Sequence, residues 1–301
     1  MIRIGVDFGG TKIEAAALDG DGRFLARVRA PSPPSYDDAL TAVRDLVAQA
    51  ERQAGARAPA VGVCGPGSLS PASGRMRNAN STHLNDRPFP EDLARILDRP
   101  VRYANDADCL ALSEATDGAG AGADVVFGAI LGTGCGGGLV AHGRLLPGAN
   151  RFAGEWGHTP LPWPSAEEHP GPRCWCGRLG CMELWVSGSG FARAAGRPAE
   201  AVIAAARAQE PASIAEFDRY VDRLARGLAV VCDILDPDVI VLGGGLSKVE
   251  ELYHRLAAAI GAHVFSDCFA TPVRPAAHGD SSGVRGAAWL WPADGSADAA
   301  A

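Results

Sequence analysis

Apolar and polar residues alternate along the first thirty positions, and this period of two predicts β-strands. The predicted strands cover residues 2–7, 13–18 and 24–28. Residues 19–22 read Asp-Gly-Asp-Gly, which is typical of a hairpin turn between the second and third strands. The chain therefore begins with an antiparallel meander whose first turn, residues 8–12, is rich in glycine.

Apolar residues spaced three and four positions apart indicate helices further along the chain. The first predicted helix follows Ser35, a preferred N-cap residue, and repeats apolar side chains up to Ala50. A longer helix is predicted over residues 214–235. Its apolar face comprises Phe217, Val221, Leu224, Leu228, Val231 and Leu235. Two further helices are expected at residues 107–115 and at about 282–291.

Short apolar strands are predicted between these helices, at residues 60–64, 101–104, 125–131 and 239–242. The mixture of hairpin strands and crossover helices indicates an α/β protein with mixed sheets. A second hairpin, with a Gly-Thr-Gly turn at residues 132–134 and a return strand at 139–141, repeats the pattern of the N-terminal hairpin. Thr133 in this turn occupies a place comparable to that of Thr11, so the chain is predicted to contain two related halves.

The composition limits the classes of partner. The chain has 301 residues, enough for one or two domains, and 47% of them are hydrophobic. Its 28 Lys and Arg residues against 35 Asp and Glu give a formal net charge of −7, which argues against nucleic acid as a partner. The N-terminus lacks the pattern of a signal peptide, and the longest uncharged stretch is too short for a membrane span. We therefore expect a cytoplasmic protein that binds no membrane.

Cysteines supply the sharpest local signal. Three of the eight cysteines, Cys174, Cys176 and Cys181, lie within eight residues of one another. Three thiolates and one histidine form a tetrahedral zinc site, and His158 and His169 are both candidates for the fourth ligand. A site closed by four protein ligands is structural, so this zinc would organise a loop. The remaining cysteines are expected in the core: Cys64, Cys109, Cys135, Cys232 and Cys268.

Three glycine-rich segments are candidates for phosphate binding, because backbone N–H groups in tight turns can surround anionic oxygens. They are Gly9-Gly10-Thr11-Lys12, the run of residues 132–138 and Gly243-Gly244-Gly245. Lys12 could meet a phosphate, and Asp7 at the end of the first strand is suited to hold Mg²⁺ through water. A P-loop would need a different residue order, and a Rossmann dinucleotide site would need a helix after the glycines of residues 132–137. Tight turns without a ligand are the alternative interpretation.

Asn105-Asp106 follows a predicted strand and precedes a predicted helix. Such residues often act only as helix caps. The functional interpretation makes Asp106 the base that accepts the proton of an attacking hydroxyl during phosphoryl transfer. Asp108 places a second carboxyl group nearby, and its charge could raise the pKa of one of the two.

Together these segments resemble the ROK family of bacterial sugar kinases over essentially the whole chain. The matching segments are Asp7-Phe8-Gly9-Gly10-Thr11-Lys12, Asn105-Asp106-Ala107, Leu131-Gly132-Thr133-Gly134, Gly154-Glu155-Trp156-Gly157-His158, Cys174-x-Cys176-x₄-Cys181-x-Glu183 and Val241-Leu242-Gly243-Gly244-Gly245. The resemblance implies a two-lobed actin-like ATPase (ribonuclease H-like) fold with the active site in the cleft. The expected lobes are residues 1–115, with helix 282–292 packing back on them, and residues 116–281, which carry the zinc loop. We expect residues 293–301 to be a disordered tail.

The same resemblance implies a role for each matching residue. Asp106 would be the general base for the transfer of the γ-phosphoryl group of Mg-ATP to a sugar 6-hydroxyl. ATP and Mg²⁺ would be bound by Asp7, Gly9, Gly10, Thr11, Lys12, Gly132, Thr133, Gly134, Gly136, Gly137, Gly138, Gly243, Gly244 and Gly245. The sugar would be bound by Asn80, Asn105, Asp106, Glu155, His158 and Glu183. Structural Zn²⁺ would be held by His158, Cys174, Cys176 and Cys181, which leaves His169 without a role.

Within the family the chain resembles the fructokinase branch most, through residues 78–82, 154–163 and 278–292. D-fructose is therefore the expected substrate, with N-acetylglucosamine, glucose and mannose as the alternatives, and a homodimer is the expected assembly. Asp108 departs from the family pattern, which usually has Asn at this place. A sugar-responsive repressor is the rival class, but the first strand at Ile2 leaves no room for its N-terminal helix-turn-helix. A non-catalytic sugar-binding protein is disfavoured by the presence of Asp106.

Overall fold

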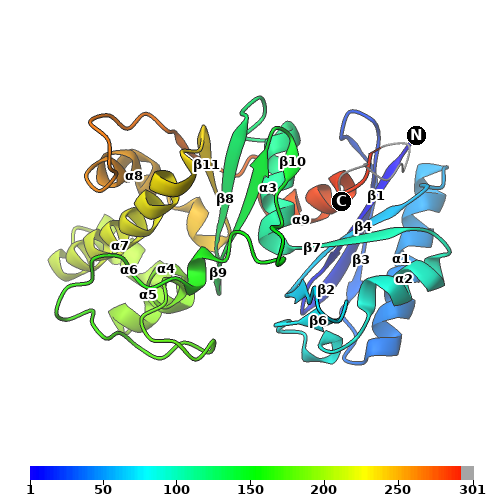
Figure 1. The fold of residues 1–301 in the computed structure, drawn as a ribbon, viewed down its shortest axis with the longest axis horizontal. Coiled ribbons are helices and arrows are strands. Elements are labelled where there is room, and N and C mark those ends of the chain that lie inside the picture. Colours follow the sequence, from blue (N-terminus) through cyan, green and yellow to red (C-terminus); the bar gives the residue numbers. More distant parts are fainter. Residues whose placement is uncertain (293–301) are drawn as a thin grey trace.

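The structure is a computed structural model that describes residues 1–292. Two five-stranded mixed sheets stand on either side of a pair of central helices (Figure 1). The expected tail at residues 293–301 lies outside the described residues. No helix within residues 1–292 combines the length and the apolar character that a membrane crossing requires.

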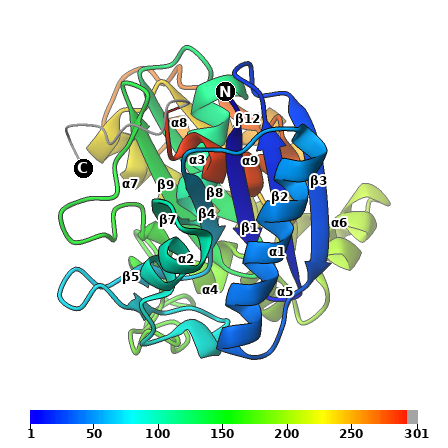
Figure 2. The same ribbon diagram turned by 90° about the vertical axis from the view of Figure 1, so that its right-hand side faces the viewer.

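The first sheet has the strand order β3-β2-β1-β4-β7. Its strands are β1 (Arg3–Phe8), β2 (Lys12–Leu18), β3 (Phe24–Pro31), β4 (Val61–Gly65) and β7 (Val101–Asn105). The first three are antiparallel neighbours, as predicted, and the last two run parallel to β1. Helices α1 (Tyr36–Ala54) and α2 (Phe89–Leu97) cover the outer face, as Figure 2 shows for α1. The Ser35 hydroxyl caps α1 by accepting a hydrogen bond from the Asp38 amide.

The second sheet repeats this arrangement. Its order is β10-β9-β8-β11-β12, with the same succession of antiparallel and parallel neighbours. Its strands are β8 (Val125–Leu131), β9 (Cys135–Ala141), β10 (Arg144–Leu145), β11 (Val239–Gly243) and β12 (Val273–Pro275). The common order and direction of the two sheets agree with the two related halves predicted from their glycine-threonine hairpins.

Helices of the second half bury the outer face of the second sheet. They are α4 (Glu183–Val186), α5 (Gly188–Ala195), α6 (Ala199–Arg207), α7 (Pro211–Leu235) and α8 (Glu250–Gly261). The predicted long helix corresponds to α7, which starts three residues earlier because Pro211 suits the first turn. Its residues Tyr220, Leu224 and Leu228 are fully buried and form the centre of this core.

The short elements complete the chain. They are the hairpin β5 (Ser68–Leu69) and β6 (Met76–Arg77) and the 3₁₀ turns η1 (Thr82–Leu84), η2 (Trp156–His158), η3 (Gly245–Lys248) and η4 (Gly279–Ser281). Both β5 and β6 belong to the first half, and η2 belongs to the second.

One sequence prediction needs correction: residues 132–138 are not a single glycine loop. The loop ends at Gly134, and Gly136, Gly137 and Gly138 are residues of β9 paired with β8. A Cβ atom on Gly138 would overlap the carbonyl oxygen of Ala107. These glycines therefore let neighbouring backbone approach the strand closely, and Gly137 and Gly138 are buried rather than available to a phosphate.

The two central helices are α3 (Asp106–Asp117) and α9 (Ser282–Trp289). α3 follows the last strand of the first sheet, yet it packs on β8 and β9 of the second. α9 comes from the end of the chain and packs on β1, β2 and β4 of the first sheet. α3, which the sequence analysis assigned to the lobe of residues 1–115, thus packs on the second sheet, whereas α9 packs on the first sheet, as expected. α9 ends two residues before the expected position, since Trp291 precedes a proline and is disfavoured in a helix.

The buried carboxylate of Glu114 holds these two helices together where they cross. Glu114 of α3 is fully buried and accepts hydrogen bonds from the backbone N–H groups of Ala119, Ala277 and His278. It also accepts one from the hydroxyl of Ser282, the first residue of α9. Because the three backbone N–H groups would be left unpaired without it, Glu114 fixes where the chain enters α9.

Gly62 determines how closely α9 approaches the first sheet. It pairs with Gly5 in the sheet, and a Cβ atom on Gly62 would overlap the carbonyl oxygen of Ala287. We expect Gly62→Ala to displace α9 and to lower the free energy of unfolding by about 2 kcal/mol, or Tm by about 5 °C. Gly20→Ala is the control, because a Cβ atom there would meet nothing within 4 Å. Equal thermal unfolding midpoints for both variants would contradict this account.

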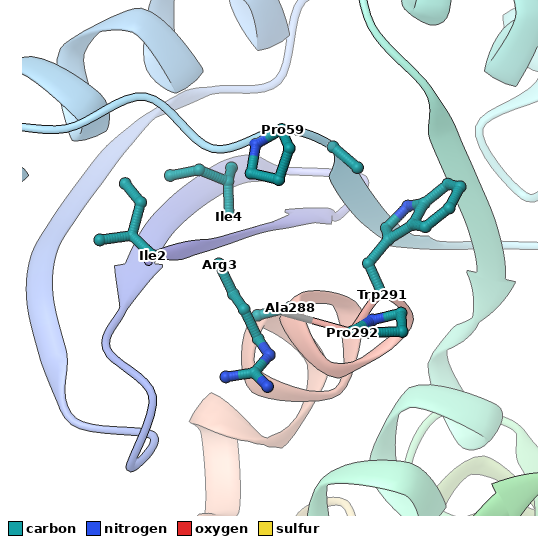
Figure 3. Close-up of a pocket in the computed structure, with 8 residues that line it drawn as sticks. Ile2, Arg3, Ile4, Pro59, Ala288, Trp291 and Pro292 are labelled. Atoms are coloured by element: carbon teal, nitrogen blue, oxygen red, sulfur yellow. The ribbon is translucent and has the colours of Figure 1, made fainter. Parts of the chain in front are cut away.

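A small enclosed cavity lies beside α9, at the end opposite the glycine turns of the site described below (Figure 3). Its lining includes Arg3, Trp291 and Pro292, and its volume of about 10 Å³ holds one water molecule. The guanidinium group of Arg3 lies 4.3 Å from the ring centroid of Trp289. This cavity is a feature of the packing and is too small for a sugar or a nucleotide.

Candidate active site

Asp106 lies at the junction between β7 and α3, where a strand ends and a helix begins. Asn105 is the N-cap: its side-chain oxygen accepts a hydrogen bond from the Asp108 amide at 2.6 Å. The amide of Ala107 donates to Asp106 Oδ1 at 2.9 Å. Capping is thus performed by Asn105, and its side-chain NH₂ group remains available as a donor.

The Asp106 carboxyl group has a solvent-exposed surface but is closely surrounded by protein atoms. Burial raises its pKa above the ordinary value, against two backbone hydrogen bonds that act in the opposite direction. A carboxylate with a raised pKa is a stronger base, and its open side can admit a substrate.

Two carboxyl groups from other segments, Asp7 and Glu155, lie close enough to Asp106 for its charge to act on them. Asp7 of β1 pairs with Glu14 of β2 in the sheet, and Glu155 immediately precedes η2. Burial, then the charges of Glu14 and Asp106, raise the pKa of Asp7 to about 6. Burial also raises the pKa of Glu155, to which the charge of Asp106 contributes. The structure therefore brings Asp7 and Glu155 close enough to Asp106 for their charges to interact with it.

The environment of Asp7 suits a hydrated divalent cation. Oxygen ligands are those that Mg²⁺ prefers, and a cation would offset the repulsion among Asp7, Glu14 and Asp106. The ammonium group of Lys12 acts on Asp7 in the same sense and lowers its pKa. Gly283 leaves room on the other side, since a Cβ atom there would lie 2.9 Å from Asp7 Oδ2.

The glycine turns come from both halves of the molecule. The first is the β1–β2 turn, closed by a hydrogen bond from the Gly9 amide to the Lys12 carbonyl at 3.0 Å, with Thr11 exposed. The second is the β8–β9 turn, in which Thr133 is exposed. Gly244 lies against this second turn, because a Cβ atom on it would be 2.6 Å from the Leu131 carbonyl. Gly243 instead ends β11, where it is buried against α3.

The start of α5 also joins the second turn. The amide of Gly188 donates to the Gly132 carbonyl at 2.7 Å, and the hydroxyl of Ser189 donates to the Thr133 carbonyl at 2.6 Å. The sequence analysis missed this neighbour, although Ser187 followed by Gly188 is a recognisable helix start. Residues 132–134 are therefore held from two sides, by α5 and by Gly244.

Glu183 is held by the residues around it. Its Oε2 accepts a hydrogen bond from the Cys135 amide at 3.1 Å, and its Oε1 accepts one from the Trp175 indole at 2.8 Å. Glu183 also acts electrostatically on Glu155. Trp175 lies in sequence between Cys174 and Cys176, two of the candidate zinc ligands. The loop that carries these cysteines therefore orients Glu183 toward the carboxyl groups of the site. The sequence analysis missed this role of Trp175.

The cysteine cluster has the dimensions of a zinc site. The ligand atoms of His158, Cys174, Cys176 and Cys181 all lie within 4.8 Å of one another. Cys174 Sγ is 3.6 Å from His158 Nδ1, and the sulfurs of Cys176 and Cys181 are also 3.6 Å apart. Sulfur ligands of a tetrahedral zinc ion lie about 3.8 Å apart, so these four residues fit Zn²⁺. His169 is not part of the cluster.

Two arginines that the sequence analysis missed face the carboxyl groups. Arg77 of β6 donates to the Asn150 carbonyl at 3.3 Å and thereby links the two halves. Its charge lowers the pKa of Glu155, whereas Arg151 lowers that of Asp108. No motif marks either residue, because their position depends on loops that meet only in the folded chain.

Asn80 follows Arg77 in an exposed loop of the first half. The Asn85 side chain fixes this loop by two hydrogen bonds with the backbone of Ala79, both at 2.9 Å. Ser81, on the other side of Asn80, approaches Gly10 of the first turn. Asn80 is thus held near the glycine turn, and its side chain remains exposed.

The two sheets have the same strand order, and two inner helices pack between them. These features, together with the similarity to solved structures, define a two-lobed α/β protein of the actin-like ATPase fold. The chain belongs to the ROK family, whose sequence model matches residues 3–294. The fold and the family predicted from the sequence are both confirmed.

Characterised relatives are similar over nearly the whole chain. The N-acetylgalactosamine kinase AgaK of Shewanella sp. (strain ANA-3) is 42% identical over 295 residues, covering 95% of both chains. The N-acetyl-D-glucosamine kinase of Pectobacterium atrosepticum is 38% identical over 297 residues, covering 95% of this chain and 97% of the relative. The crystal structure of the ROK hexokinase from Thermus thermophilus has a TM-score of 0.85 at 32% identity, covering 96% and 97%.

Proposed function

We propose that this protein is an ATP-dependent sugar kinase that transfers the γ-phosphoryl group to the 6-hydroxyl of an N-acetylated hexosamine. The observation that carries the proposal is Asp106, a carboxylate with a raised pKa at the first position of α3. Its charge acts on Glu155 and on Asp7 at the end of β1, beside the first glycine turn. Asp106 accepts the proton of the 6-hydroxyl as that oxygen attacks the phosphoryl group.

The remaining residues divide between the two substrates. The amides of the turns at residues 9–12 and 132–134, together with Gly244 and Gly245, contact the nucleotide, and Asp7 holds the hydrated Mg²⁺ that accompanies ATP. The sugar hydroxyls are bound by Asn80, Asn105, Glu155, His158 and Glu183. Bound Mg²⁺ neutralises charge on the phosphates during the transfer.

We also propose that His158, Cys174, Cys176 and Cys181 hold one structural zinc ion. The contact distances and the donor set support it. His158 then serves two purposes, because its Nδ1 faces the cysteine sulfurs and its other ring nitrogen is left for the sugar. Trp175, within the same loop, keeps Glu183 in place.

An N-acetylated hexosamine is preferred to fructose because of the relatives. Their printed activities concern N-acetylgalactosamine and N-acetyl-D-glucosamine, at 42% and 38% identity. The resemblance to fructokinases in residues 78–82, 154–163 and 278–292 receives no support from these comparisons. We therefore replace D-fructose by its alternative as the proposed substrate.

A coupled assay of ADP release tests this choice. The substrates are N-acetylglucosamine, N-acetylgalactosamine, glucose, mannose and fructose, each with Mg-ATP. We expect kcat/KM for the better N-acetylated sugar to exceed that for fructose by at least about tenfold, because polar groups that pair with one sugar are left unpaired by another.

Two results would contradict the proposal in different ways. A tenfold preference for fructose would restore the fructokinase assignment and leave the kinase assignment unchanged. Absence of turnover with every sugar, in a protein that still binds them by calorimetry, would indicate a sugar-binding protein without catalysis. The product from the better substrate should carry its phosphate on O6, which ³¹P–¹H NMR correlation can verify.

A further inference from the structure

Asp108 is a buried carboxyl group with an unpaired oxygen. It is the third residue of α3, and the residue is only 8% exposed. Among residues 1–292, its Oδ1 has no hydrogen-bond partner. An unpaired oxygen of a buried carboxylate is costly, because the ion has lost its water without a replacement.

The groups that face Asp108 make the ionised form still less favourable. Asp106 approaches from the same helix, and Glu155 approaches from the segment before η2. Gly138 of β9 lies against the Asp108 backbone and brings no charge. The opposing influences are the backbone N–H of Asn105 and the charge of Arg151. The charges that act on Asp108 are therefore negative on balance, because two carboxylates outnumber one arginine.

We propose that Asp108 is a positioning residue of the active site, which in its neutral form donates its one hydroxyl proton toward Glu155 and so keeps Glu155 placed for the sugar. The inference rests on the proposed function, because it assigns the sugar to Glu155. Asp108 touches neither the phosphoryl group nor the attacking oxygen in this account. It acts through the carboxyl groups beside it.

The charge state of Asp108 changes within the physiological range. Burial first, and then the charges of Asp106 and Glu155, raise its pKa to about 7. Below that pH the group is neutral and donates a hydrogen bond; above it the group is ionised and faces two carboxylates. Glu155 would then be repelled from the start of α3. Binding of the sugar should therefore weaken as the pH rises through about 7.

The test is the pH dependence of the sugar KM between pH 6.5 and pH 8.5. For the wild-type protein we expect KM to rise about 25-fold across this range, because the competent fraction falls as Asp108 ionises with a pKa of about 7. Asp108→Asn should keep KM nearly constant, since an amide donates at every pH. Asp108→Ala should have a high KM throughout. The change in kcat with pH should be alike in wild type and Asp108→Asn.

Asp21→Asn is the matched control, because it removes one carboxylate from an exposed turn far from the site. It should reproduce the wild-type profile. Identical KM profiles for wild type and Asp108→Asn would overturn the inference, and so would a wild-type KM for Asp108→Ala at pH 6.5. Circular dichroism establishes that each variant is folded.

A second readout is independent of turnover. Infrared difference spectra of the wild-type protein should show a carboxyl group that loses its proton near pH 7, and this signal should vanish in Asp108→Asn. If no sugar is phosphorylated but the signal is present, the proposed function is wrong, whereas the inferred protonation of Asp108 is supported. If sugar is phosphorylated and Asp108→Asn removes no carboxyl signal near pH 7, the inference about Asp108 fails alone.

Discussion

Replacement of Asp106 by asparagine should lower kcat by about 10²–10⁴-fold, the usual contribution of a general base. Asparagine has nearly the same shape and can still accept the hydrogen bond that the Ala107 amide donates to this side chain. It cannot take up the proton of the attacking 6-hydroxyl. Affinity for ATP and for the sugar should change little, because the contacts of the turns and of Glu183 are untouched.

Steady-state assays at saturating sugar and Mg-ATP measure kcat, and calorimetry measures both affinities. Asp124→Asn is the control: the carboxylate of this exposed residue lies 3.6 Å from His142 Nδ1, and the substitution should leave kcat unchanged. A variant Asp106→Asn with more than about half the wild-type kcat would assign the base elsewhere or show that none is required. Loss of sugar affinity together with kcat would mean that Asp106 also positions the substrate.

Removal of one zinc thiolate should be the most damaging change to stability. Cys174→Ser and Cys176→Ser should abolish the binding of one zinc ion per chain, as measured by metal analysis of the purified protein. A cost of about 3 kcal/mol would lower Tm by about 8 °C. The KM for the sugar should rise as well, because the loop then no longer holds Trp175 against Glu183.

Cys268→Ser is the matched control. The sequence analysis expected Cys268 in the core, but it is an exposed free cysteine outside the cluster. It should retain the zinc, the wild-type Tm and the wild-type KM. A wild-type protein purified without chelators that contains no zinc would refute the site. Zinc that is bound but leaves KM unchanged on removal would show that Glu183 is oriented without the loop.

The elements that the sequence predicted well are those governed by local pattern. Ser35 marks the start of α1 and the repeated apolar face marks α7, because capping and amphipathic spacing act over one or two turns. Strand β9 was predicted too short for the opposite reason. Glycines at 136–138 resemble a loop in sequence, but they are required by the close approach of Ala107 and Gly154 from distant parts of the chain.

The candidate site divides in the same way. Sequence motifs predicted Asp106, the glycine turns and the cysteine cluster, because each of these needs particular residue types at a fixed spacing. The links between these motifs have no such spacing: Trp175 reaches Glu183 from the cysteine loop, and Arg77 reaches Asn150 from the other half. The neutral form inferred for Asp108 depends on burial and on Glu155, neither of which the sequence can show.

The exchange of α3 and α9 between the sheets limits how the chain can be divided. A fragment ending at residue 117 would carry α3 without β8 and β9, and its first sheet would lack α9. The complementary fragment would have α9 without β1 and β4. Each piece would expose apolar surface and should aggregate when expressed alone. Co-expressed pieces cut within the turns at residues 118–124 should instead assemble into a whole enzyme, as a split protein whose halves complete one another.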